Sequence, residues 1–164
     1  MHRSAGFQPA SADGNIRNAA GTAGPGPGKL ILRAGLYDQL LAEAHAAFPH
    51  ECCGLIEGVR AGRQIEAVRF HSARNLAERT DRFEIDPMEQ FRLLRLLQNT
   101  QREIVGCYHS HPNGRPAPSA RDHEGAAEEN FVWLIASLAN DGATDCAAFL
   151  FVGRTFEMLK LTVR

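Results

Sequence analysis

The chain has 164 residues and a formal net charge of -1, from 18 Lys and Arg against 19 Asp and Glu. This length suits one domain and excludes two full enzyme domains, because domains usually have about 100 to 200 residues. The balanced charge offers no field that would attract a polyanion, so it argues against general binding of nucleic acid or of a membrane surface.

The N-terminal residues 1–28 are rich in glycine and proline and end in Gly24-Pro25-Gly26-Pro27-Gly28. This composition predicts a disordered tail followed by one folded domain over residues 29–164. The tail has no apolar core of the kind found in secretory signals, and the four cysteines lack the density of a disulfide scaffold. We therefore expect a cytoplasmic protein. The longest apolar stretches are far shorter than the roughly 20 residues that cross a bilayer, so we interpret them as buried strands.

The first half of the domain alternates between strand and helix patterns. Lys29 to Arg33 is predicted as a strand, and apolar residues from Leu36 to Phe48 recur at helical spacing until Pro49. Cys53 to Val59 and Gln64 to Phe70 then suit a hairpin, because the loop between them is short and contains glycine.

The second half continues this alternation. Arg82 to Ile85 is expected to be a short extended strand, and Pro87 lies where a helix begins. A strand over Ile104 to Tyr108, a loop over Asn113 to Pro118, a helix from Ser119 and three strands from Phe131 onward follow. The order predicts the α/β (α+β) class, with a mixed β-sheet flanked by helices.

One segment concentrates residues that bind metals, His109-Ser110-His111-Pro112, followed by Ser119 and Asp122. Because side chains alternate along a strand, His109 and His111 point to the same face and can reach one metal ion. The proline-rich loop turns the chain back and can bring Asp122 to the same point. Two His and one Asp leave a fourth position for water, as in catalytic zinc sites.

Zinc with these ligands can lower the pKa of a bound water to about 7. The water then needs a group that accepts its proton and passes it to a leaving amine, and a carboxylate outside the ligand set can do this. Glu51 is the candidate for this proton transfer, because it lies at the start of a strand just after Pro49 ends the predicted helix.

Each of these residues also has an ordinary structural interpretation. Two histidines on a strand can simply be polar or buried residues, and Glu51 can be a solvated residue at a strand end. Ser119 with Asp122 also matches a helix N-terminus, with Ser as the N-cap and an acid in the first turn. The two roles of Asp122 are compatible, because a helix N-terminus keeps the carboxylate ionised.

The whole pattern, H-x-H-P-x(5)-P-S-x-x-D, resembles the signature of the JAMM or MPN+ metalloprotease family. The segment Pro49 to Gly58 is similar to the family's upstream E-x-C-G-L-L-x-G stretch. The resemblance implies a cytidine-deaminase-like JAMM/MPN fold, zinc ligands His109, His111 and Asp122, and Glu51 as general base and acid. It also implies that Ser119 helps to hold the oxyanion of the tetrahedral intermediate.

The resemblance is to the small bacterial type, which implies a ubiquitin-like sulfur-carrier protein with a Gly-Gly tail as substrate. The expected reaction is hydrolysis of the peptide or isopeptide bond after that tail. Two alternatives remain at this stage: a non-catalytic MPN-type interaction module, and a metallopeptidase of phage-tail or cell-wall type.

Overall fold

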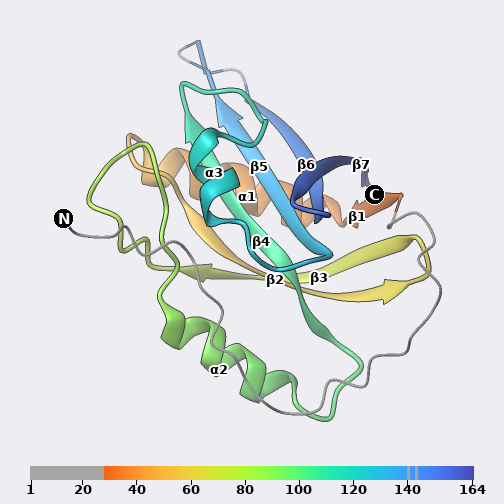
Figure 1. The fold of residues 1–164 in the computed structure, drawn as a ribbon. Coiled ribbons are helices and arrows are strands. Elements are labelled where there is room, and N and C mark those ends of the chain that lie inside the picture. Colours follow the sequence, from red (N-terminus) through yellow and green to blue (C-terminus); the bar gives the residue numbers. More distant parts are fainter. Residues whose placement is uncertain (1–27, 140, 143) are drawn as a thin grey trace.

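The computed structural model describes residues 28–139, 141–142 and 144–164, which fold into a mixed sheet with helices packed on it (Figure 1). The elements in chain order are β1 (Lys29–Leu32), α1 (Ala34–Ala47), β2 (Cys53–Ala61), β3 (Gln64–Ala73), α2 (Pro87–Leu97), β4 (Glu103–Pro112), α3 (Ala120–Gly125), β5 (Phe131–Leu138), β6 (Thr144–Val152) and β7 (Thr155–Val163).

The sheet closes into a barrel in the order β1-β3-β2-β4-β5-β6-β7. Its antiparallel pairs are β2/β3, β2/β4, β5/β6 and β6/β7, while β4/β5, β1/β3 and β1/β7 are parallel. Gly106 lets β4 and β5 approach closely, because an added Cβ would overlap the backbone of Val132. The mixed sheet with flanking helices confirms the predicted fold class, and the closure is an additional feature.

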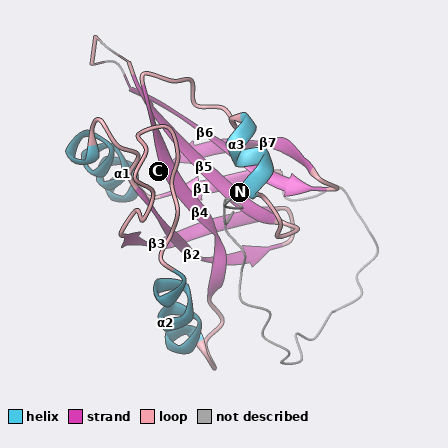
Figure 2. Ribbon diagram, turned by 60° about the vertical axis from the view of Figure 1, so that its left-hand side comes forward, coloured by secondary structure: helices cyan, strands magenta, loops and turns pink. Residues whose placement is uncertain are grey.

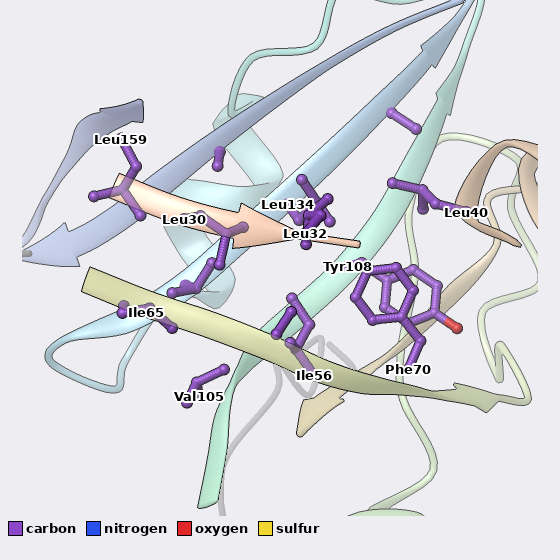
Figure 3. Packing of buried hydrophobic residues seen from close by; sticks show 14 of the residues in the cluster. Leu30, Leu32, Leu40, Ile56, Ile65, Phe70, Val105, Tyr108, Leu134 and Leu159 are labelled. Carbon is purple, nitrogen blue, oxygen red and sulfur yellow. The ribbon is translucent and has the colours of Figure 1, made fainter. Parts of the chain in front are cut away.

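One hydrophobic core lies under α1. Leu40 and Ala44 of this helix are fully buried in a cluster that also contains Leu32, Tyr108 and Leu134. Figure 3 shows Tyr108 beside Phe70, and their ring centroids are 4.7 Å apart. This core joins α1 to the middle of β4 and β5.

A second core lies on the other face of the sheet. Leu93 and Leu97 of α2 pack in it with Cys107 and Trp133 from β4 and β5. α2 begins as Pro87 suggests, because the Asp86 carboxylate caps it by accepting a hydrogen bond from the Met88 N–H at 2.9 Å.

Figures 1 and 2 show α1 and α3 on opposite sides of β4 and β5, so the two faces of these strands have different neighbours.

Most predicted elements are confirmed. One expectation is wrong: Arg82 to Ile85 is no strand, and its only ladder contact among the described residues is a bridge between Asn75 and Ile85. The Asn75 side chain bonds to the backbone of this segment in place of a strand ladder: its Nδ2 donates to the Arg82 carbonyl, and its Oδ1 accepts from the Glu84 N–H. The tail prediction concerns residues 1–27, which lie outside the described part, and Gly28. In the described residues, no helix is long and apolar enough to span a membrane.

Candidate metal centre

β4 presents both histidines on one face, as their spacing predicts. His109 is fully buried and His111 is 9% exposed. They lie within the strand and not beyond its end, because β4 runs to Pro112. The strand is longer than predicted because β5 continues to pair with it alongside both histidines, as His109↔Ile135 and His111↔Ser137.

The loop after β4 returns the chain so that α3 begins at the same place. Ser119 caps this helix: its Oγ accepts a hydrogen bond from the Asp122 N–H at 3.2 Å. In return the Asp122 carboxylate accepts the Ser119 N–H at 2.6 Å, which completes a capping box. The cap therefore fixes the orientation of the buried Asp122 side chain.

The three predicted ligands converge. The Nε2 atoms of His109 and His111 are 2.9 Å apart, and the two Asp122 carboxylate oxygens lie 3.2 Å and 3.3 Å from them. The candidate ligand atoms all fall within 4.8 Å of one another. Such a group of two imidazoles and one carboxylate has the composition of an open catalytic zinc site.

The protonation states also suit a cation. His111 donates its Nδ1–H to the Arg115 carbonyl at 2.8 Å, which leaves an electron pair on Nε2 directed at the group. Burial lowers the pKa of His109, so this imidazole is neutral at pH 7. Burial would raise the pKa of Asp122, but its bonds with both histidines and with the Ser119 N–H lower it instead. A neutral His109 imidazole and an ionised Asp122 carboxylate are donors that fit Zn²⁺.

The pKa of His111 shifts the other way for a related reason. Burial disfavours its charged form, yet the contact with Asp122 and the Arg115 carbonyl outweigh burial and raise the pKa. The same carboxylate that attracts a proton to this imidazole would attract a metal cation.

Glu51 lies next to this group because of the sheet register. β2 and β4 pair antiparallel with Cys53 opposite His109, and the Ser110 N–H donates to the Cys52 carbonyl at 3.1 Å. Extended by two residues beyond the paired strands, this register would bring Glu51 opposite His111, and the Glu51 carboxylate does interact electrostatically with His111 and Asp122. Glu51 is 6% exposed, and burial raises its pKa to about 8. A carboxylate with this pKa exchanges protons readily near neutral pH.

An open pocket of about 430 Å³ adjoins Glu51. Its lining includes Glu43 from α1, Cys52 just before β2, Cys53 at the start of β2, and Ser72 and Asn75 from β3 and the segment after it. The pocket borders Glu51, whereas His109, His111 and Asp122 are not among its lining residues.

Two residues at the site are absent from the sequence predictions. Phe83 stacks on His109 with ring centroids 4.3 Å apart, and Asn75 bonds to the Glu51 backbone. His109 Nδ1 is buried without a hydrogen-bond partner among the described residues, so aromatic packing helps to orient this ring. The sequence gives little signal for either residue, because both approach from a loop whose path depends on the fold.

Comparison with known proteins places the chain in a family. The family model described as prokaryotic homologs of the JAB domain matches residues 33–151. The chain belongs to this family. This confirms the resemblance inferred from the histidine, serine and aspartate pattern.

Two relatives with assigned names are similar over two thirds of the chain. A desampylase of Haloferax volcanii is 35% identical over 114 residues, which are 66% of this chain and 81% of that protein. A CysO-cysteine peptidase of Mycobacterium tuberculosis is 29% identical over 109 residues, 66% of this chain and 73% of that protein.

Solved structures support the same fold. The solution structure of a Desulfitobacterium hafniense protein has a TM-score of 0.74 at 29% identity and covers 82% of this chain and 92% of its own. A JAB1/MPN domain protein from Archaeoglobus fulgidus has a TM-score of 0.52 at 18% identity, covering 83% and 97%, and shows likeness of fold alone. The JAMM/MPN fold predicted from the motif is confirmed.

Proposed function

We propose that the chain is a zinc-dependent peptidase or isopeptidase that cleaves the bond after the C-terminal Gly-Gly of a ubiquitin-like sulfur-carrier protein. The observation that carries this proposal is the convergence of His109, His111 and Asp122 on one point, with the buried Glu51 close enough to interact electrostatically with His111 and Asp122. The names of the desampylase and the CysO-cysteine peptidase support the class of reaction.

His109, His111 and Asp122 would hold the zinc, and Ser119 would keep Asp122 in place through the capping box. When bound, zinc acts as a Lewis acid toward a carbonyl and makes water a nucleophile at neutral pH. The open fourth position of such a ligand set distinguishes a catalytic site from a purely structural one.

Glu51 moves the protons in the proposed reaction. Its carboxylate accepts a proton from the attacking water and returns it to the nitrogen of the leaving amine. Because burial raises the pKa of Glu51 to about 8, both the protonated and the ionised form of its carboxyl group are populated near pH 7.

Ser119 can take part without giving up its role as a cap. A hydroxyl has one hydrogen to donate and two electron pairs that accept. The cap uses an accepting pair for the Asp122 N–H, so the hydroxyl hydrogen stays available for an oxyanion that develops on the substrate carbonyl.

A Gly-Gly tail suits this site physically. An extended chain without Cβ atoms can add to a sheet edge and lie close to the backbone of the site. The pocket beside Glu51 gives room for the residue that leaves. We place the enzyme in the cytoplasm, where the four free cysteines stay reduced.

The test is the variant Glu51→Gln, assayed on a ubiquitin-like protein whose Gly-Gly tail is extended by cysteine. Intact mass follows the trimming. We expect the wild type to release the carrier ending in Gly-Gly, and the variant to keep its zinc and lose turnover by about 10²- to 10⁴-fold, the usual contribution of a general base.

The control is Glu124→Gln, which removes the same charge from an exposed position on α3. It should cleave like the wild type. Unchanged cleavage by Glu51→Gln would remove Glu51 from the mechanism, and failure of the zinc-loaded wild type to trim any such carrier would overturn the proposed function.

A further inference from the structure

The segment from Asn75 to Ile85, here called the strap, connects β3 to α2 and contacts the metal centre. Its Phe83 ring stacks on the His109 ring at an interplanar angle of 24°. Its Asp81 pairs with Arg121 of α3 at 3.2 Å, one residue before Asp122. The strap therefore touches both elements that carry the candidate ligands.

One side chain holds the start and the end of the strap together. Asn75 uses its Oδ1 to accept hydrogen bonds from the Ala77 N–H at 2.9 Å and from the Glu84 N–H at 3.0 Å. Its Nδ2 donates to the Arg82 carbonyl at 3.2 Å and to the Glu51 carbonyl at 3.0 Å. These four bonds use the full capacity of the two Nδ2 hydrogens and the two Oδ1 electron pairs.

The bond to Glu51 stands where a strand ladder would otherwise continue. β2 pairs with β3 from Cys53↔Ala73, and extending this register by two residues puts Asn75 opposite Glu51. The strand ends at Ala73, so the Asn75 side chain, rather than a backbone pair, holds the Glu51 carbonyl. On the other side, the β2/β4 register, extended by two residues, would bring Glu51 opposite His111.

We propose that Asn75 is a positioning residue for catalysis, which fixes the Glu51 backbone so that the Glu51 carboxylate stays aligned with the metal centre. This inference rests on the proposed function. The strap cannot move away from the site while the four bonds are intact, because the same side chain binds both the strap and Glu51. Asn75 itself contacts no reacting atom.

A purely structural role makes a different prediction. If Asn75 only shapes the strap, the loss of its bonds to Ala77, Arg82 and Glu84 should lower the melting temperature and leave kcat unchanged. The variant Asn75→Asp keeps the Oδ1 acceptor but replaces the donating Nδ2 with an oxygen that faces the carbonyls of Glu51 and Arg82. Asn75→Ala removes all four bonds, so a similar loss of kcat in both variants, with a larger loss of stability in Asn75→Ala, would identify the Nδ2 donor as the group that turnover depends on.

A matched control comes from the turn between α2 and β4. Thr100 uses its Oγ1 to accept the Arg102 N–H at 3.1 Å and to donate to the Leu97 carbonyl at 2.8 Å. Like Asn75, Thr100 holds a loop together through side-chain hydrogen bonds, but none of the bonds described reaches a residue of the candidate site. Thr100→Ala therefore measures how the loss of such loop bonds alone changes stability and kcat.

The experiment compares the wild type, Asn75→Ala, Asn75→Asp and Thr100→Ala in zinc content, melting temperature and single-turnover and steady-state kinetics on the cysteine-extended carrier. We expect both Asn75 variants to retain zinc and to lose kcat by about 10- to 100-fold, as misplacement of a catalytic group does. KM should change by less than about threefold, and Thr100→Ala should keep the wild-type kcat.

Combination with Glu51→Gln identifies the route of the effect. If Asn75 acts through Glu51, Asn75→Ala should cause no further loss of kcat once Glu51 is already Gln, because residues that act as a unit are not additive. An equal additional loss in that background, or wild-type kcat in Asn75→Ala, would overturn the inference.

Hydrogen exchange gives a readout that does not depend on activity. Asn75→Ala should speed amide exchange in peptides spanning residues 50–53, while peptides spanning 105–110 of β4 stay protected. Unchanged exchange at 50–53 would contradict the inference even if the wild type cleaves no carrier. A wild type that cleaves, together with an unaffected Glu51→Gln variant, would overturn the role of Glu51 and this inference with it, while the proposed peptidase function would stand.

Discussion

At the scale of single residues, Asp122 shows how local folding can prepare a candidate metal ligand. One carboxylate completes the capping box with the Ser119 N–H and also faces both histidines. Because the cap forms from neighbours three residues apart, the ligand is oriented by local sequence before any metal binds. Preorganised ligands of this kind do not lose side-chain freedom when the cation arrives.

Ser119→Ala separates capping from catalysis. We expect the loss of the cap to cost about 1 kcal/mol in stability. The loss of an oxyanion donor should cost about 2.7 to 4 kcal/mol in the barrier, which is a decrease in kcat of about 10²- to 10³-fold. Thermal melting and kcat on the cysteine-extended carrier measure the two effects separately.

The control for this variant is Asp86→Ala, which removes the N-cap of α2. It should lower the melting temperature by a similar amount and leave kcat at the wild-type level. If Ser119→Ala also keeps its kcat within about twofold while it melts earlier, Ser119 is a cap and no more.

The candidate ligands could be predicted because their geometry is local. Alternation along one strand puts His109 and His111 on one face, and a short loop returns Asp122 to them. Glu51 could be proposed only as a candidate, because its place near His111 depends on how β2 pairs with β4. Asn75 and Phe83 could not be predicted, since hydrogen bonds and ring stacking from a loop leave no periodic pattern.

At the scale of elements, β2 carries a buried charge away from the metal centre. Glu57 is 3% exposed and lies where the β2/β3 and β2/β4 registers shift. Its carboxylate contacts His71 Nε2 of β3 at 2.8 Å and Arg102 Nη1, just before β4, also at 2.8 Å. These two contacts satisfy a charge that would otherwise be costly to bury.

This cluster predicts a pH-dependent contribution to stability. Burial would raise the pKa of Glu57, but hydrogen bonds from Arg102 and then His71 lower it below its ordinary value. A carboxyl whose pKa is lower in the folded state stabilises the protein above its unfolded pKa, and that contribution disappears as pH falls through the folded value. The interaction should therefore be intact at pH 7 and lost in acid.

Arg102→Gln tests it through urea unfolding of the zinc-free protein from about pH 7 down to pH 3. We expect the variant to be about 1 to 2 kcal/mol less stable at pH 7, a moderate value because Arg102 is half exposed. The difference should shrink toward pH 3. The control is Arg92→Gln, which breaks the exposed pair with Glu89 and should change the free energy of unfolding only slightly at every pH. If Arg102→Gln lowered the free energy of unfolding by a large amount that did not depend on pH, the assignment to Glu57 would be wrong.

Elements built from local signals were predicted well. The helix before Pro49, the β2/β3 hairpin and the start of α2 follow from periodicity, a short loop and a proline. The expected strand at Arg82 to Ile85 was wrong, because its short extended pattern did not reveal that Asn75 would satisfy the backbone instead.

At the scale of the whole molecule, the barrel closes through contacts that are remote in sequence. The four-residue strand β1 pairs in parallel with β3 on one side and with β7, near the C-terminus, on the other. Pairing between segments more than 120 residues apart leaves no local trace, so the sequence predicted strands and their order but not the closure. The nearby hairpin β2/β3 could be predicted because a short loop connects its strands.

The last prediction concerns this closure. Leu32 of β1 is fully buried in the core under α1, while its register partner on β7, Val163, is 44% exposed. Leu32→Ala should destabilise the protein by about 2 to 5 kcal/mol, because it leaves a cavity in a packed core. Val163→Ala, which shortens an exposed side chain in the same ladder, should cost only about 0.5 kcal/mol.

Urea unfolding followed by the fluorescence of Trp133, the single tryptophan of the chain, measures both variants. Trp133 lies on β5 in the other core, so its signal reports on global unfolding if β1 is part of the same cooperative unit. Equal small losses for Leu32→Ala and Val163→Ala would mean that β1 detaches without unfolding the rest. Leu32 shares its core with Tyr108 and Leu134 but belongs to another cluster than the one around Trp133, so in the proposed enzyme Leu32→Ala should still bind zinc and cleave the carrier at temperatures where it is folded.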